Sequence, residues 1–171
     1  MRWLTFIILA LIALTLQSAV APRVAPFGIR PDWLLILVVF IALHAPPRQA
    51  TIGAWIVGGL ADLMTIERPG LVAASYTLAA VLIISARNYL FRYRTTTRFV
   101  VTLLACLLVR VLWTLYFRTL YNPGRPLLTA LMTDVFLASL YTGLWALPVH
   151  RGLQRVSRAF GLVRLRYNFG T

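Results

Sequence analysis

Lysine is absent from this chain, and only four of its 171 residues are acidic. The chain has seventeen arginines, so its net charge is +13. Charged residues make up 12% of the sequence, about half the share that is usual in soluble domains. Hydrophobic residues make up 60%, more than a soluble domain of this length can bury. The composition therefore excludes an ordinary soluble domain and predicts an integral membrane protein.

Cysteine is nearly absent as well. Cys106 is the single cysteine, so no disulfide can form within the chain, and no Cys/His spacing resembles a metal site. The serines have no acid–base constellation near them in the sequence, and no glycine-rich phosphate loop appears. The arginines stand at the ends of apolar runs rather than on one solvated face, which argues against nucleic-acid binding. We predict no enzymatic activity, no catalytic residue, no cofactor and no metal.

What the chain does have is a series of long apolar runs separated by Pro, Gly and Arg. They predict an all-α membrane protein, with residues 1–149 forming a bundle of about six transmembrane helices. The predicted helices cover residues 3–21, 32–45, 49–66, 71–90, 99–121 and 127–149. The second is short against the roughly 20 residues of a full span. The first could be a signal peptide cleaved after Ala21, but Pro22 disfavours cleavage there, and we interpret it as a retained helix.

The arginines predict an orientation for these helices. With six spans and a cytoplasmic N-terminus, the inside segments carry eleven arginines and the outside loops carry five. Cytoplasmic loops of membrane proteins carry the excess of positive charge. We therefore expect a multi-pass protein of the cytoplasmic membrane with both termini in the cytoplasm.

Residues 150–171 are too polar to span a membrane. Apolar residues recur there every three or four positions, and arginines occupy the other faces. Those arginines are Arg151, Arg155, Arg158, Arg164 and Arg166. This pattern favours a basic amphipathic tail on the anionic cytoplasmic leaflet. A docking helix for a cytoplasmic partner is the alternative.

The third predicted helix carries small residues at a spacing of four. Ala50, Ala54 and Gly58 lead along one face to Asp62. Small residues let helices approach closely in lipid. The face is expected either to pack within the chain's own bundle or to form a groove for a partner's transmembrane helix.

Asp62, Asp134 and Arg110 fall inside apolar runs, where a charge is expensive and usually faces a partner or a cavity. An ion pair of Arg110 with Asp134, or with Asp62, would neutralise that cost. Such a pair could serve only the fold, bind a partner, or line a solute or proton pathway.

Three segments between residues 30 and 90 resemble the rod shape-determining protein MreD family. They are Arg30-Pro31-Asp32-Trp33, then Gly58-Gly59-Leu60-Ala61-Asp62, and then Pro69-Gly70-Leu71 with Ala74-Ser75-Tyr76. The length, the six predicted helices and the basic C-terminus also resemble that family. Its architecture is similar to that of the substrate-binding subunits of energy-coupling-factor vitamin transporters.

The resemblance implies a non-enzymatic inner-membrane scaffold or regulatory subunit of the bacterial rod-shape machinery, or elongasome. It implies binding to an MreC-like single-span protein, to position or activate lateral peptidoglycan synthesis. Further implied partners are an MreB-like filament, a RodA-type glycosyltransferase and a class B penicillin-binding transpeptidase, besides membrane lipids. The alternative is a small-molecule, vitamin-like uptake subunit. It predicts a polar or aromatic-lined cavity, with Trp33, Trp55, Trp113 and Tyr116 as candidate lining residues.

Overall fold

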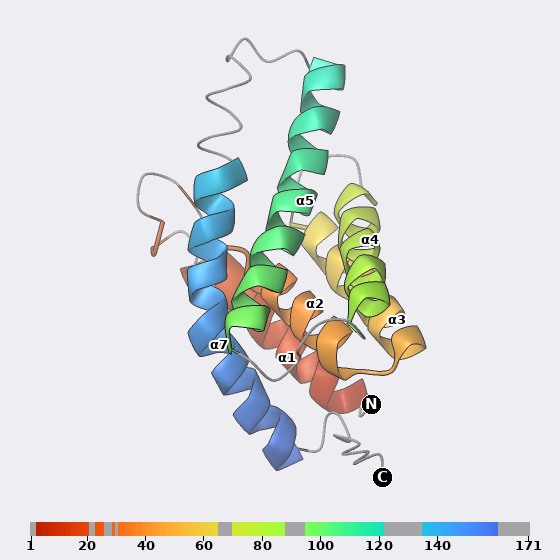
Figure 1. Ribbon diagram of the computed structural model, residues 1–171, viewed down its shortest axis with the longest axis vertical. Coiled ribbons are helices and arrows are strands. Elements are labelled where there is room, and N and C mark those ends of the chain that lie inside the picture. Colours follow the sequence, from red (N-terminus) through yellow and green to blue (C-terminus); the bar gives the residue numbers. More distant parts are fainter. Residues whose placement is uncertain are drawn as a thin grey trace.

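The computed structural model shows a bundle of helices (Figure 1). It describes residues 3–20, 23–25, 29, 31–64, 70–87, 95–121 and 135–160, with the backbone alone at 95–97, 117–121 and 157–160. These residues hold six α-helices, π-helical stretches at 16–20 and 135–137, and no strand. The helices are α1 (Trp3–Thr15), continued by the π-helical turn η1 (Leu16–Val20), α2 (Trp33–His44), α3 (Pro47–Asp62), α4 (Leu71–Ala86), α5 (Thr95–Tyr121) and α7 (Ala138–Phe160). The predicted all-α class is confirmed.

Helix α2 lies at the centre of the bundle. Every residue from Trp33 to Leu43 is buried, and the helix contacts α1, α3, α4, α5 and α7 (Figure 1). A helix that is apolar on all faces needs such complete burial or lipid on every side. Its twelve residues extend roughly 18 Å, well short of a hydrocarbon core of roughly 30 Å. Helix α2, which the sequence showed to be short for a membrane span, is therefore enclosed by the other helices.

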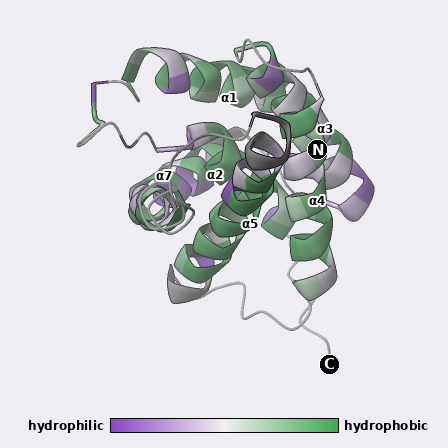
Figure 2. Ribbon diagram, turned by 90° about the horizontal axis from the view of Figure 1, so that it is seen from above, coloured by the Kyte–Doolittle hydropathy of each residue, from purple (hydrophilic) through white to green (hydrophobic). Residues whose placement is uncertain are grey.

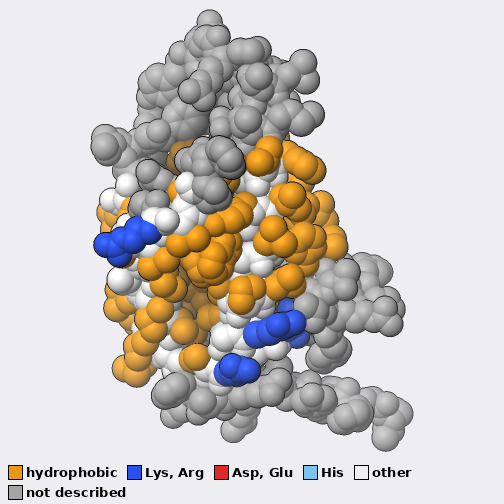
Figure 3. Space-filling model, turned by 90° about the vertical axis from the view of Figure 1, so that its left-hand side faces the viewer, with side chains coloured by type: hydrophobic (Ala, Val, Ile, Leu, Met, Phe, Trp, Pro, Cys, Tyr) orange, Lys and Arg blue, Asp and Glu red, His pale blue; other side chains and the backbone are white. Residues whose placement is uncertain are grey.

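The outer helices expose apolar side chains. Two helical segments, Trp3–Val20 and Arg98–Tyr116, are long and apolar enough to cross a membrane, and only 22% and 28% of their residues are buried. A core helix of a soluble protein would be mostly buried, so these two segments present their apolar side chains outward. Hydrophobic residues predominate along the helices (Figure 2), and they cover much of the described surface in Figure 3. Lipid is the solvent that suits such an exterior.

Serine and threonine hydroxyls within the helices bond to the chain's own backbone. Each donates to the carbonyl four residues earlier, at 2.6–3.0 Å. The hydroxyls belong to Thr15, Thr51, Ser75, Thr77, Ser85, Thr102, Thr114, Ser139 and Thr142. The bond satisfies a polar side chain without water.

The helix bounds differ from the sequence-based prediction mainly at α7. The sequence placed a helix end at residue 149, but α7 continues through Pro148 to Phe160. Pro148 is exposed, so the carbonyl that its missing N–H leaves unbonded lies near the protein surface. The start of the last predicted helix, residues 127–134, lies outside the described residues. The first residues of the tail therefore continue the last helix.

Helices α3 and α4 form the closest helix pair. A Cβ atom added to Gly58 would lie 2.5 Å from the Cα of Ala73, so the two backbones touch at this point. Ala50 and Ala54 lie on the same face of α3 and are also buried. The small residues that the sequence singled out therefore pack inside the chain. The close contact with α4 at Gly58 fills this face, so the face is not an open groove for a partner's helix.

We predict opposite effects of alanine at two neighbouring glycines. Gly58→Ala should lower the free energy of unfolding by about 1–3 kcal/mol, because the new methyl group meets the backbone of α4. Gly59→Ala should leave it unchanged or raise it by up to about 1 kcal/mol, because nothing lies within 4 Å of its added Cβ and alanine favours helix. Thermal unfolding of the two variants in the same detergent measures the difference. Equal midpoints would contradict the contact.

Candidate functional site: the polar junction of α2, α3 and α4

The carboxylate of Asp62 closes the junction between α3 and α4. Its Oδ2 accepts hydrogen bonds from the backbone N–H groups of Gly70 and Ala73, both at 3.0 Å. Its Oδ1 accepts one from the N–H of Val72, also at 3.0 Å. Asp62 ends α3 and is only 6% exposed. One side chain thus satisfies three of the donors that the start of α4 leaves without a partner in the helix.

Two effects stabilise this arrangement. The negative carboxylate meets the positive end of the α4 dipole, and each of its hydrogen bonds is charge-assisted. Gly70, the N-cap residue of α4, has φ = 105°, in the left-handed region that glycine adopts without cost. The Pro69-Gly70-Leu71 segment of the family resemblance therefore contains the residue that turns the chain into α4.

A second carboxylate, Asp32, joins three helices at the same end of the bundle, which we call the acidic end. Its Oδ1 accepts from the N–H of Leu35 at 3.0 Å and caps α2. Its Oδ2 accepts from the hydroxyl of Tyr76 on α4 at 2.7 Å. Its own N–H donates to Thr142 on α7 at 3.3 Å. The start of α2 is therefore bonded to both α4 and α7.

Aromatic packing surrounds this start of α2. The Trp33 ring lies 5.0 Å from that of Trp145 on α7, and the backbone N–H of Trp33 donates to the side-chain oxygen of Gln17 at 2.8 Å. The hydroxyl of Tyr141 donates to the carbonyl of Val24 at 2.6 Å. These contacts hold η1 against the start of α2 and the segment after η1 against α7.

Arg110 on α5 interacts electrostatically with Tyr76 and with Cys106. Asp32 interacts electrostatically with the same two residues. The half-buried arginine therefore belongs to the electrostatic surroundings of the Asp32–Tyr76 pair. Its predicted partner, Asp134, lies outside the described residues, and that ion pair stays a prediction. The alternative partner, Asp62, directs both carboxylate oxygens to the backbone of α4.

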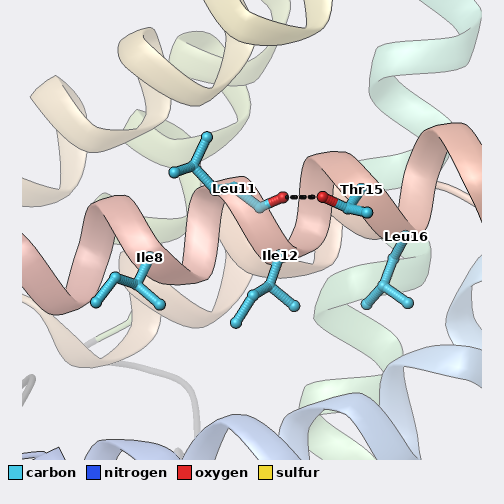
Figure 4. Close-up of a pocket in the computed structure, with 5 residues that line it drawn as sticks. All are labelled: Ile8, Leu11, Ile12, Thr15 and Leu16. Atoms are coloured by element: carbon cyan, nitrogen blue, oxygen red, sulfur yellow. Dashed lines mark hydrogen bonds between the residues drawn. The ribbon is translucent and has the colours of Figure 1, made fainter.

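The four aromatic residues proposed for a solute cavity are absent from the lining of the cavity described below. Trp33 packs on Trp145, Trp55 is 61% exposed and Trp113 packs against the hydrophobic core. One cavity among the described residues lies beside α1, with a volume of about 360 Å³. Its lining residues are Ile8, Leu11, Ile12, Thr15 and Leu16 (Figure 4). None of the proposed residues lines it.

Of the predicted tail arginines, the structure describes the side chains of Arg151 and Arg155, and both are exposed on α7. The backbone of Arg158 belongs to the same helix, and Arg164 and Arg166 lie outside the described residues. His150 lies inside α7 and is 1% exposed. The membrane-surface role of the tail stays a prediction.

Sequence reasoning recognised Asp62 but missed the reason for its position, and it missed Tyr76 as the partner of Asp32. The signal for Asp62 was available: an aspartate at a helix end followed eight residues later by glycine at the next helix start. No local signal pairs Asp32 with Tyr76, because 44 residues separate them.

The described residues thus define an all-α protein with an apolar exterior, two helices able to cross a bilayer and carboxylates that cap helix starts. A family model described as rod shape-determining protein MreD matches residues 1–146. The chain therefore belongs to the MreD family of rod shape-determining proteins. Comparisons with curated proteins and with solved structures found no match.

We predict that Asp62→Ala destabilises the protein by about 3 kcal/mol or more, because it leaves three buried or half-buried N–H groups without an acceptor. Asp62→Asn should cost less, since an amide retains one oxygen acceptor. Size-exclusion profiles after heating, in one detergent, rank the two variants against the parent. Equal stability of Asp62→Ala and the parent would contradict the cap.

Tyr76→Phe should cost about 1–3 kcal/mol, because it removes the hydroxyl that donates to Asp32 and keeps the ring. A double-mutant cycle with Asp32→Ala isolates the pair, and we expect the second substitution to cost less once the first is present. Additive losses of unfolding free energy would mean that the two residues act independently.

Proposed function

We propose that this chain is a non-enzymatic subunit of the rod-shape machinery in the bacterial inner membrane. In this role it binds an MreC-like single-span protein and thereby positions or activates lateral peptidoglycan synthesis. The match to the MreD family over residues 1–146 carries the proposal. The exposed apolar helices support a membrane location. An MreB-like filament, a RodA-type glycosyltransferase and a class B transpeptidase are the further proposed partners.

The proposed orientation places both termini in the cytoplasm and the acidic end of the bundle toward the outside. The arginine distribution of the sequence supports this orientation. In this arrangement Asp32 and Asp62 lie near the outer membrane surface, where their carboxylates are partly withdrawn from the hydrocarbon.

The site of partner binding is proposed on α1 rather than on α3. A partner helix on the small-residue face of α3 would displace α4 and remove all three donors from Asp62. Helix α1, in contrast, exposes an apolar face beside the described cavity, with Leu4, Ile7, Ile8, Leu11 and Ile12 each at least 48% exposed. A partner helix on that face would not displace α4 from Asp62.

The shape of this face suits a helix. Ile8, Ile12 and Leu16 follow one another at a spacing of four, and their side chains project to the same side of α1 (Figure 4). A row with this spacing forms a ridge that fits the groove of another helix. A single apolar helix of an MreC-like protein is the proposed occupant.

Leu11→Trp should therefore reduce recovery of an MreC-like partner about tenfold, equivalent to about 1.4 kcal/mol of binding free energy. The larger ring would fill the cavity that Leu11 lines. Leu82→Trp is the matched control, because Leu82 is 47% exposed on α4 and lies outside the proposed face of α1. Affinity purification from mild detergent with quantitative mass spectrometry measures recovery.

Three outcomes separate the possibilities. Loss with Leu11→Trp alone supports both the role and the site. Undiminished recovery with both variants leaves the scaffold role in place but moves the interface away from α1. Absence of any wall-synthesis partner from the parent purification, with a bound small molecule instead, overturns the scaffold role in favour of solute uptake.

A further inference from the structure

The helices of the bundle differ widely in length. Helix α5 has 27 residues and extends roughly 40 Å. Helices α3 and α4 have 16 residues each and extend only roughly 24 Å. These two helices lie side by side at one edge of the bundle (Figures 1 and 2). Because the hydrocarbon core of a bilayer is roughly 30 Å thick, α5 exceeds it whereas the α3–α4 pair is too short for it.

The outward side of this pair, which we call the short face, is apolar. Ile52 and Trp55 on α3 are 49% and 61% exposed. Leu78, Val81 and Leu82 on α4 are each at least 42% exposed. In the membrane location proposed above, side chains of this kind contact acyl chains.

Charged residues bound the short face at both ends. Arg48 is exposed in the first turn of α3, and Arg87 directly follows α4. In the sequence, Glu67 and Arg68 lie between the two helices. A hydrocarbon core thicker than the two helices are long would bring charged groups into contact with acyl chains, which is costly.

Two of the end groups are held in place. The carboxylate of Asp62 accepts three hydrogen bonds from the backbone at the start of α4. The guanidinium of Arg87 donates to the carbonyl of Ala45 at 2.9 Å. Long basic side chains at helix ends usually reach outward to the membrane surface, but the reach of Arg87 is used to bond the end of α2. Neither group is available to extend toward a more distant layer of headgroups.

A helix shorter than the bilayer is accommodated in one of three ways: the end groups reach outward, another helix covers the face, or the bilayer becomes thinner. The fixed positions of Asp62 and Arg87 disfavour the first. Close association of helices in lipid uses small residues, and Ala50, Ala54 and Gly58 of α3 are buried inside the chain. The large exposed side chains of the short face suit flexible acyl chains instead.

We propose that the bilayer is thinner beside the short face than beside α5, so that the short face binds lipids with short acyl chains in preference. The occupant of this face is therefore lipid rather than a protein helix. The inference rests on the proposed membrane location but is independent of the partner protein and of its site on α1.

Trp55 is a natural reporter of this lipid, because its ring is exposed near the middle of α3. Phosphatidylcholines with brominated acyl chains quench tryptophan fluorescence on contact. The full-length protein is reconstituted in mixtures of brominated dimyristoleoyl-phosphatidylcholine with plain dierucoyl-phosphatidylcholine, and in mixtures with the bromine exchanged. The quenching that is lost in Trp55→Phe belongs to Trp55. We expect the short chains to be favoured about threefold at this position.

A matched reporter on α5 tests whether the preference is local. Leu104→Trp, made in the Trp55→Phe variant, adds a tryptophan at a residue that is 58% exposed within the membrane-length segment Arg98–Tyr116. Because α5 is longer than the hydrocarbon core is thick, we expect no preference for short chains at position 104.

A preference at Trp55 without one at position 104 supports local thinning. Equal preferences at both positions would overturn it, since the whole protein would then favour short chains. Equal quenching of Trp55 by short and long chains would overturn it too. Quenching at position 104 without any at Trp55 would mean that protein covers the short face. An absence of quenching at both positions would instead contradict the membrane location itself.

Discussion

The position of α4 depends on one carboxylate. Asp62 bonds three N–H groups at the start of that helix, and the carboxylate and the donors Val72 and Ala73 are buried. One turn before Asp62 in α3, Gly58 lets the backbones of α3 and α4 touch. The two features act together, because the close approach brings the start of α4 within reach of a side chain as short as aspartate. The remaining helices pack around this pair and α2.

Helix α2 is held at both of its ends by α4. At the acidic end Tyr76 donates to Asp32, and at the opposite end, where α2 ends, Arg87 donates to the carbonyl of Ala45 at 2.9 Å. The first bond fixes the helix that Asp32 caps, and the second supplies a cation at the negative end of its dipole. The central helix carries no charged residue between these ends, so its polar contacts all lie where the chain enters and leaves the bundle.

This use of polar groups has a consequence for function. The two described carboxylates are engaged in holding helices, so recognition of other molecules falls to the outer surfaces. Among the described residues, the apolar face of α1 with its cavity is one such surface. The proposed scaffold role needs a surface for another helix, and an exposed apolar helix face suits that need.

The sequence by itself determined the helical class, four of the helices to within a few residues, the family and the small-residue face of α3. These follow from apolar periodicity, turn residues and short motifs, all of which act over a few positions. It did not determine that α4 covers that face, that α2 is enclosed by five helices, or that Tyr76 meets Asp32. Periodicity reports which face of a helix is apolar or small, but every such face in a membrane protein fits lipid, a partner or a neighbouring helix equally well. Only the tertiary structure, by bringing residues 44 or more positions apart into contact, decided among them.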